Sequence, residues 1–381
     1  MPHQQPLPPE YADLDAAEAQ RRIAQRKGRL GPDLCLLGHH YQRDEVFQFA
    51  DFTGDSLKLS QQAASVAARH IVFCGVHFMA ESAEIITGGS RVVILPHAGA
   101  GCAMSEMADA DDVAEAIERV AAAAGEKVVP ITYVNSSAAA KAVTGKAGGA
   151  CCTSANARNV FEWALRPVEK GGAGGAKVFA IPDQHLGRNT AAAMGFPLHD
   201  CVLYDPQKPG GGLSDGQIRA AKFILWKGHC YVHQRFSVEQ VAAVRRRMPQ
   251  IKVIVHPECP HEVVAAADYA GSTEQILRAV NDSPAGAAWA VGTEAKMVHR
   301  LARNNPDKHV QTLSDSPPLC VTMAKIDLAH LLWALDNLAA GVVVNRITVP
   351  SETAADARVA LERMLALKAV AAPTAVKPTI D

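Results

Sequence analysis

The chain has 381 residues, of which 48% are apolar and 20% charged, and its formal net charge is −1. That length suggests two or three domains, and the balanced charge without a basic stripe argues against a nucleic-acid partner. No apolar run approaches the roughly 20 residues of a membrane helix, and residues 1–10 lack the features of a secretory signal. We therefore expect a cytoplasmic protein with no membrane partner and a short disordered lead.

The nine cysteines form no recognisable local motif. The absence of a Cys-x-x-Cys pair argues against a zinc ribbon or a thioredoxin-like motif, and a cytoplasmic protein rarely carries a disulfide framework. Most of these cysteines are therefore expected in the core. Any functional ones have to come together from distant parts of the chain.

Short apolar runs alternate along the chain with Ala-rich stretches of helical character. Helices are predicted over residues 111–125, 237–248 and 272–282, and terminal helices over about 11–28 and 351–370. This alternation is typical of α/β units with parallel sheets. The predicted buried strands are "DLCLLG", "HIVFCGV", "RVVILP", "KVVPITYV", "KVFAIP", "DCVLY", "IKVIVH" and "AAWAVGT".

One pattern recurs along the chain. The stretches "HHYQRDEVFQFADFTGDS" (39–56) and "HPECPHEVVAAADYAGST" (256–273) each follow an apolar strand and end in a hydroxyl seventeen residues after a histidine. In a third copy, Ser154 follows the strand end at Asn135 by nineteen residues. Each copy then reaches a cysteine, after 46 residues (102−56), 76 (230−154) and 47 (320−273). Gly-rich insertions that look like surface loops explain the longer middle copy.

The repeat predicts three similar αβα-sandwich domains with short parallel sheets, in a pseudo-threefold arrangement around a central cluster and active site. Ligands of open α/β sheets bind at the carboxyl ends of the strands, where all these motifs lie. The expected segments are 1–29 (lead and helix), 30–122, 123–246, 247–347 (the three domains) and 348–381 (helix and tail).

One cysteine in each copy stands at an equivalent place: Cys102, Cys230 and Cys320. Three thiolates suit soft metals and iron–sulfur chemistry, and a cubane held by three cysteines leaves one iron open as a Lewis acid. A structural zinc site would need a fourth protein ligand. The donors and acid–base groups expected around the three cysteines favour an anionic substrate and loss of water from a carboxylate.

Ordinary structural roles compete with each of these readings. Cys35, Cys74, Cys151, Cys152 and Cys201 are expected in the core, and Cys259 has no counterpart in the other copies. The hydroxyls that end "GDS" and "GST" would serve equally as helix N-caps. Weaker site candidates near strand ends are His77, His185, His233 and Glu294.

Several long motifs, in order from about residue 33 to 365, resemble the quinolinate synthase family. They include "GHHYQRDEVFQFADFTGDSLKLSQQAA", "TYVNSSAAAKA", "CCTSANA", "ILWKGHCYVHQRF", "VHPECPHEVVAAADYAGST" and "LCVTMAKIDLAHLLWALDNL". The resemblance implies three αβα domains around an oxygen-sensitive [4Fe-4S] cluster with three cysteine ligands and one open iron. It also implies condensation of iminoaspartate with dihydroxyacetone phosphate to quinolinate, the precursor of NAD, with release of phosphate and two waters.

The resemblance assigns roles to particular residues. The cluster ligands are Cys102, Cys230 and Cys320, called the ligand cysteines below. Tyr41, His256 and Glu258 are implied to move protons in catalysis. The implied substrate contacts are His39, Ser56, Tyr133, Val134, Asn135, Ser154, His256, Pro257, Glu258 and Thr273.

Two other functions stay open at this point. One is another [4Fe-4S] hydro-lyase that acts on a small carboxylic acid, and the other is a metal or redox sensor without enzymatic activity. A sensor needs no pocket of convergent His, Tyr, Glu and hydroxyl groups, which favours an enzyme. An aspartate oxidase or dehydrogenase is the expected partner that supplies iminoaspartate.

Overall fold

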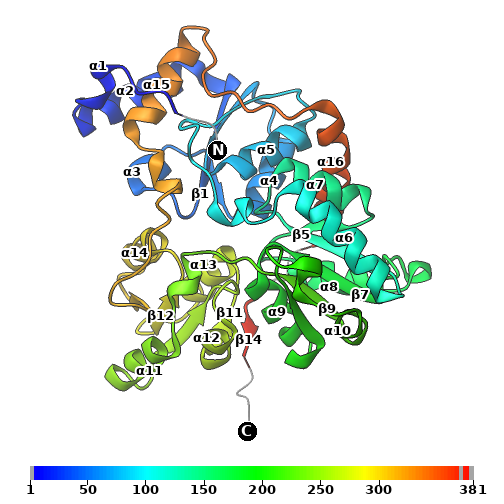
Figure 1. The fold of residues 1–381 in the computed structure, drawn as a ribbon. Helices are drawn as coiled ribbons and strands as arrows, with labels where there is room; N and C mark the ends of the chain where they lie inside the picture. The colour runs from blue at the N-terminus through cyan, green and yellow to red at the C-terminus, as the bar shows by residue number, and fades with distance from the viewer. Residues whose placement is uncertain (1–3, 369–371, 377–381) are drawn as a thin grey trace. The chain divides into compact units, whose positions relative to one another are not determined.

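A computed structural model describes residues 4–368 and 372–376 (Figure 1). Within them the strands form three sheets, and every pairing of named strands is parallel except that of β14 (Thr374–Ala375) with its neighbour. The predicted α/β class is therefore confirmed. The chain divides into two compact units: residues up to 102 together with 320–354, and residues 103–319 together with those from 355.

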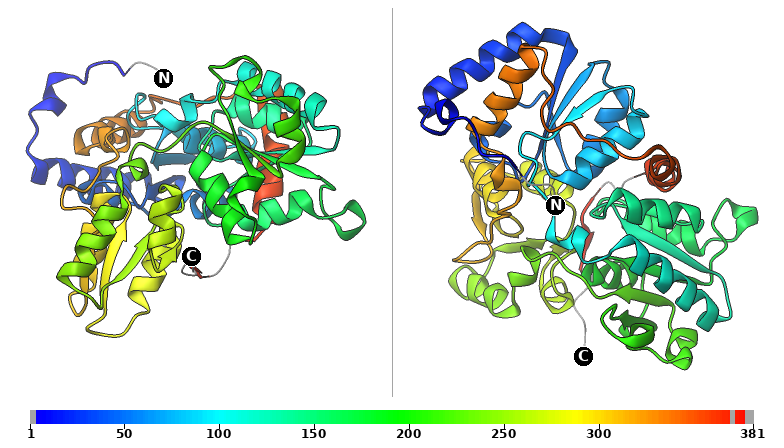
Figure 2. Two further views of the ribbon diagram at one scale, coloured as in Figure 1. Left: turned by 60° about the horizontal axis from the view of Figure 1, so that its bottom comes forward. Right: turned by 45° about the horizontal axis from the view of Figure 1, so that its top comes forward.

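The first unit contains a sheet in the order β2-β1-β3-β4. Helices α2 and α15 pack together on one face of this sheet, and α4 and α5 cover the other (Figure 2). The strand β1 is buried along its whole length, as expected for an inner strand of a parallel sheet. The elements are α1 (Pro9–Ala12), α2 (Ala16–Leu30), β1 (Leu34–His39), α3 (Asp44–Phe47), β2 (Phe52–Gly54), α4 (Ser56–Ser65), β3 (His70–Cys74), α5 (His77–Thr87), β4 (Val92–Ile94) and α15 (Leu328–Ala339).

The N-terminal lead differs from the sequence-based expectation of disorder. Residues 1–3 lie outside the described residues, but Gln4 is held in place: its Oε1 accepts hydrogen bonds from Ala98 N at 2.8 Å and Asn345 Nδ2 at 2.9 Å. These two donors lie far along the chain, so no local pattern predicts the contact. The described part of the lead is therefore ordered by tertiary hydrogen bonds.

The second sheet has the order β6-β5-β7-β9-β8. Helices α6, α7 and α10 pack beside one another, as do α8 and α9. The fully buried Trp226 at the end of β9 anchors the core below α6, and its Nε1 donates to Met107 O at 2.8 Å. The elements are α6 (Ala110–Ala124), β5 (Val128–Tyr133), α7 (Ala138–Lys146), β6 (Ala150–Cys152), α8 (Ala157–Leu165), β7 (Lys177–Ile181), α9 (Gln184–Ala193), β8 (Cys201–Tyr204), α10 (Asp215–Ala220) and β9 (Phe223–Trp226).

The third sheet has the order β13-β12-β10-β11-β14 and lies in the same unit as the second. Its core joins residues of α11, β10 and α12, among them Val253, Val263 and the fully buried Cys259. The elements are α11 (Val238–Arg247), β10 (Lys252–Val255), α12 (His261–Ala266), β11 (Tyr269–Ala270), α13 (Thr273–Asn281), β12 (Ala288–Gly292), α14 (Ala295–Asn304) and β13 (His309–Thr312).

The three sheets repeat one strand order. In each, the first strand along the chain lies between the second and third, and a fourth follows the third: β2-β1-β3-β4, β6-β5-β7-β9 and β11-β10-β12-β13. The second sheet adds β8 outside β9. The strand β8 corresponds to the predicted strand "DCVLY", and the Gly-rich loop predicted after it contains the start of α10. The repeat inferred from the sequence is present in the topology, whereas the pseudo-threefold arrangement stays a prediction.

Two helices complete the second unit. Helix α6 packs against the second sheet, although the sequence-based segments placed residues 110–122 with the first domain; those boundaries stay a prediction. Helix α16 (Ser351–Ala366) approaches α7 so closely that a Cβ on Gly145 would lie 2.1 Å from Asp356 O. Glycine at that position is what permits this contact between backbones.

Candidate active site

The second and third sheets bring several predicted site residues together at the carboxyl ends of their strands. Tyr133 is the last residue of β5, and His256 and Glu258 follow β10 directly. Thr293 follows β12 in the same way. In a parallel sheet this edge is where backbone groups and side chains are open to a ligand.

Glu258 is the centre of this cluster. Its side chain is 3% exposed, and Oε1 accepts a hydrogen bond from Tyr133 Oη at 2.5 Å. Its Oε2 lies 2.6 Å from His233 Nδ1, and His233 Nε2 lies 3.0 Å from Thr293 Oγ1. Because a carboxylate only accepts, His233 carries a proton on Nδ1. Both carboxylate oxygens are thus held by donors.

Burial and charge set the protonation of this cluster. Burial raises the pKa of Glu258, but the charges of His256 and His233 and the hydrogen bonds lower it more, so the net pKa lies below its usual range. Burial, reinforced by the charge of Glu258, raises the pKa of Tyr133 well above its ordinary value. At neutral pH the pair is therefore a carboxylate with a protonated phenol.

His256 is buried beside this pair. Burial, followed by the charge of His233, lowers the pKa of His256 to about 3, so the ring is neutral at pH 7. Its Nδ1 accepts from Glu258 N at 3.4 Å, which leaves Nε2 as the donor to Ser154 Oγ at 3.2 Å. The rings of His233 and His256 stack with centroids 4.4 Å apart. This neutral imidazole has one donor aimed at a predicted substrate contact.

The negative charge of Glu258 affects the pKa of a second carboxyl group, that of Asp183. Asp183 caps α9 by accepting from His185 N and Leu186 N, both at 2.7 Å. Burial, and then the negative charge of Glu258, raise the pKa of Asp183 well above its usual value. Two carboxyl groups with opposite pKa shifts in one site are a common arrangement for acid–base work.

Two predicted contacts present polar atoms without a protein partner. Asn135 Oδ1 and Thr273 Oγ1 are buried and have no hydrogen-bond partner among the described residues. Buried polar atoms are nearly always paired, so these two atoms indicate a place for a polar ligand. Ser272, not Thr273, caps α13 by accepting from Gln275 N, which leaves the Thr273 hydroxyl available. Val134 is buried, and its N donates to Cys152 O at 2.8 Å.

The remaining predicted contacts lie in the first unit. His39 ends β1, and its Nδ1 accepts from Tyr41 N at 3.1 Å, with the rings 4.8 Å apart at 79°. Ser56 is the first residue of α4, whose N-cap is Asp55. The register pairs His39 with Gly54 at the end of β2, so this histidine and Ser56 stand at one edge of the first sheet. Ser154, by contrast, lies in the second unit, in the turn before α8.

The turns that begin at His39 and at His256 have the same hydrogen bonds. The N–H of Tyr41 or Glu258, two residues on, donates to the histidine Nδ1. The N–H three residues on, of Gln42 or Cys259, donates to the histidine carbonyl. Asp51 and Asp268 are equivalent too, since each accepts from a backbone N–H of the first strand, Leu36 N at 2.8 Å and Val253 N at 2.7 Å. The sequence repeat therefore corresponds to one repeated structure.

The ligand cysteines share one position in the fold. Each is half-buried, as Cys201 also is, and each follows the fourth strand in the shared strand order, before a short 3-10 turn. Two of the loops touch in the first unit, where Lys325 Nζ donates to Gly99 O at 3.0 Å and the rings of His97 and His330 lie 4.4 Å apart. Burial raises the pKa of every other thiol, which disfavours the metal-binding thiolate; these are Cys35, Cys74, Cys151, Cys152, Cys201 and Cys259.

Cys230 also belongs to a smaller group. One ligand atom each of Cys230, His233 and Glu258 lies within 4.8 Å of the other two. Cys, His and Glu together are a donor set that binds zinc or iron. In the structure His233 and Glu258 are already hydrogen-bonded to each other. This group therefore connects a predicted cluster ligand to the Glu258 cluster.

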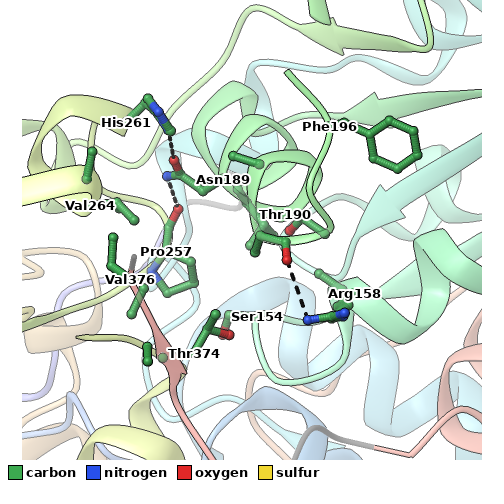
Figure 3. A pocket seen from close by; sticks show the side chains of 18 of the residues that line it. Ser154, Arg158, Asn189, Thr190, Phe196, Pro257, His261, Val264, Thr374 and Val376 are labelled. Atoms are coloured by element: carbon green, nitrogen blue, oxygen red, sulfur yellow. Dashed lines mark hydrogen bonds between the residues drawn. The ribbon is translucent and has the colours of Figure 1, made fainter. Parts of the chain in front are cut away.

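A cavity of about 570 Å³ borders the site in the second unit (Figure 3). It lies between residues of α8 and α9 on one side and of α12, β11 and β14 on the other, and its lining is mainly apolar. Ser154 and Pro257 line it, and Ser154 also contacts His256. The cavity therefore adjoins two of the predicted substrate contacts.

Three residues of the cluster were missed or undervalued by sequence reasoning. His233 was only a weak candidate, and Asp183 and Thr293 were not candidates. A signal exists for the last two, because each follows the second inner strand of its repeat, β7 or β12. His233 has no such signal, since its partner Glu258 follows a strand of another sheet.

Comparison with known proteins identifies relatives over almost the whole length. A family model described as quinolinate synthetase A protein matches residues 21–366. The quinolinate synthase of Streptomyces coelicolor is 53% identical over 364 residues, which cover 94% of this chain and 90% of that protein. That of Acidobacterium capsulatum is 50% identical, covering 94% and 95%, and that of Anoxybacillus flavithermus is 48% identical, covering 94% and 96%.

Among the described residues, no helix has the length and apolar character needed to cross a membrane.

Proposed function

The chain belongs to the quinolinate synthetase A protein family, and on that premise we propose that it condenses iminoaspartate with dihydroxyacetone phosphate to quinolinate. Phosphate and two waters leave, and the product feeds NAD biosynthesis. A cytoplasmic location, and an aspartate oxidase or dehydrogenase as supplier of the unstable imine, are part of the same proposal.

The observation that carries the proposal is the Glu258 cluster. Condensation, isomerisation and ring closure each require proton transfers at carbon, nitrogen or oxygen. A buried carboxylate held by Tyr133 and His233 supplies a base in a fixed position. Burial and the charge of Glu258 raise the pKa of Asp183, which makes this carboxyl group the candidate acid of the pair. A metal or redox sensor has no use for this pair.

The polar atoms around Glu258 fit a substrate that has both an N–H donor and a negatively charged group. Asn135 Oδ1 accepts from an imine or amine N–H, while the hydroxyl of Thr273 is available to donate to a carboxylate or phosphate oxygen. His256 Nε2 and Ser154 Oγ form a neutral donor pair at the same edge. We propose that these groups orient the two substrates. His39, Tyr41 and Ser56 stay substrate contacts that the resemblance to the family implies.

The residues present fit a [4Fe-4S] cluster. The donors are three half-buried cysteines, while burial keeps the other six thiols protonated. Cys102, Cys230 and Cys320 would hold the cluster. When bound, it supplies a Lewis-acid iron that polarises a hydroxyl or carboxylate and assists loss of water.

The second candidate function is another [4Fe-4S] hydro-lyase that acts on a small carboxylic acid. The Cys230, His233 and Glu258 group favours it, because a metal and a base at one place suffice for dehydration alone. One experiment distinguishes the two. The protein is purified without oxygen, iron and sulfide are counted, and iminoaspartate and dihydroxyacetone phosphate are supplied together and singly. Quinolinate from the pair supports the proposal; a cluster-loaded protein that forms none contradicts it.

A further inference from the structure

One buried amide grips the turn that carries Glu258. Asn189, 5% exposed, projects from α9 of the second domain toward the turn of residues 256–259 in the third (Figure 3). Its Nδ2 donates to two backbone carbonyls, Pro257 O at 2.8 Å and Cys259 O at 2.9 Å. These are the carbonyls on either side of Glu258.

The third contact of this amide fixes its orientation. Asn189 Oδ1 lies 2.8 Å from His261 Nδ1. If the amide were turned over, its oxygen would face two carbonyl oxygens, so the oxygen must face the ring and His261 must donate from Nδ1. Both amide protons are then used on the turn. We call the Asn189 amide with its bonds to Pro257 O and Cys259 O the clamp. Its amide is fully hydrogen-bonded, as a buried polar group should be.

The clamp determines where the carboxylate lies. Glu258 reaches Tyr133 and His233 at 2.5 and 2.6 Å, and both partners come from the second domain, as Asn189 does. Within the third sheet the turn is held by Glu258 N to His256 Nδ1 at 3.4 Å, Cys259 N to His256 O at 3.0 Å and His256 N to Gly292 O at 3.0 Å. These bonds do not fix its distance from the loops of the second sheet. The side chain of His256 reaches Ser154 there, whereas Asn189 contacts the backbone of the turn itself and can set that distance.

We propose that Asn189 is a positioning residue that holds Glu258 against Tyr133 and His233 by clamping the carbonyls of Pro257 and Cys259. This inference rests on the proposed function. A displacement of about 1 Å in a catalytic group can cost about a hundredfold in rate, so a backbone clamp next to the base acts on turnover rather than on affinity alone.

The test is Asn189→Ala, with Asn305→Ala as the matched control. Asn305 is 6% exposed, and its Nδ2 also donates two hydrogen bonds, to Asn281 Oδ1 and Leu301 O, both at 2.9 Å. Both variants lose a buried amide and some stability. Only Asn189→Ala should lower kcat, by about 10- to 100-fold, with KM and iron content close to those of the wild type.

A double-mutant cycle separates positioning from a general loss of structure. If Asn189 acts through Glu258, adding Asn189→Ala to Glu258→Gln lowers kcat no further, whereas independent effects multiply. His261→Ala is a milder variant, since it removes only the contact that orients the amide, and it should lower kcat by less. The inference is overturned if kcat is unchanged in both Asn189→Ala and His261→Ala, or if the effects of Asn189→Ala and Glu258→Gln multiply. If Asn189→Ala does not fold, the kcat of His261→Ala decides.

Hydrogen–deuterium exchange gives a readout that does not depend on the reaction. The peptide containing residues 256–261 should exchange faster in Asn189→Ala and at the wild-type rate in Asn305→Ala. Unchanged exchange overturns the clamp even if the wild type makes no quinolinate. A wild type that makes none, with faster exchange in the variant, refutes the proposed function but leaves the clamp standing.

Discussion

Glu258→Gln tests the centre of the proposed site while changing its shape little. Glutamine keeps an oxygen that can accept from Tyr133 Oη and places an amide where Oε2 met His233 Nδ1. His233 can adopt the tautomer with its proton on Nε2, from which it donates to Thr293 Oγ1 at 3.0 Å. The hydrogen bonds can therefore be kept, while the base is lost.

The size of the effect follows from that difference. A general base contributes about 10²–10⁴ to a rate, so kcat should fall at least a hundredfold. Exchanging hydrogen bonds of a carboxylate for those of an amide costs about 1–2 kcal/mol of stability. The ligand cysteines are untouched, so iron and sulfide content should not change. Activity and stability thus move by very different amounts.

The assay is quinolinate formation under anaerobic conditions, with iron content measured on the same sample. Glu262→Gln is the control, because Glu262 is an exposed carboxylate four residues away on α12. It should keep the wild-type rate. If Glu258→Gln also keeps it, Glu258 has no part in proton transfer and the reasoning from its hydrogen bonds is wrong.

Three further predictions concern the cluster, the phenol and the packing. Changing any one of the ligand cysteines to serine should abolish the visible absorbance and the bound iron, whereas Cys259→Ser should keep both; the reverse result would disprove the ligand assignment. Tyr133→Phe should lower kcat about tenfold, because it removes one of two partners of the carboxylate; steady-state kinetics measures this effect, and an unchanged kcat would contradict it. Gly145→Ala should lower the free energy of unfolding by about 1–3 kcal/mol, since its Cβ would meet a backbone oxygen at 2.1 Å. Gly28→Ala, in α2 with nothing within 4 Å, should raise it by about 0.5–1 kcal/mol in the same urea titration.

The features predicted best from the sequence are those that depend on local pattern. The buried strands and the repeat follow from apolar runs and from pairs such as Asp51 and Asp268, whose carboxylates make the same backbone contact. Their side chains satisfy backbone groups a fixed distance away, so similar sequences form similar turns. The Gly-rich insertion was only partly predicted, because the loop expected after the strand "DCVLY" also contains the start of α10.

Contacts between distant segments could not be predicted in this way. His256 and Ser154 were each expected at the substrate, but their hydrogen bond joins residues 102 apart. The neighbouring residues Ser272 and Thr273 of "GST" also show what the sequence alone does not decide. Both residues have hydroxyls suited to an N-cap, and only the structure shows that Ser272 takes that role and that the buried Thr273 hydroxyl has no partner among the described residues.

The origin of the contacts around Glu258 explains why the repeat alone did not predict them. The turn that carries this residue is built like the turn of His39 to Gln42, in which tyrosine occupies the equivalent position. The contacts that hold the carboxylate come from segments of the second sheet: the phenol of Tyr133, the ring of His233 and the amide of Asn189. A repeated turn therefore supplies the backbone, and the segments of the neighbouring sheet supply the partners of its side chain. If Glu258 is the base that we propose, substitutions in those segments should change its contribution to turnover, as the Asn189 and Glu258 double-mutant cycle will measure.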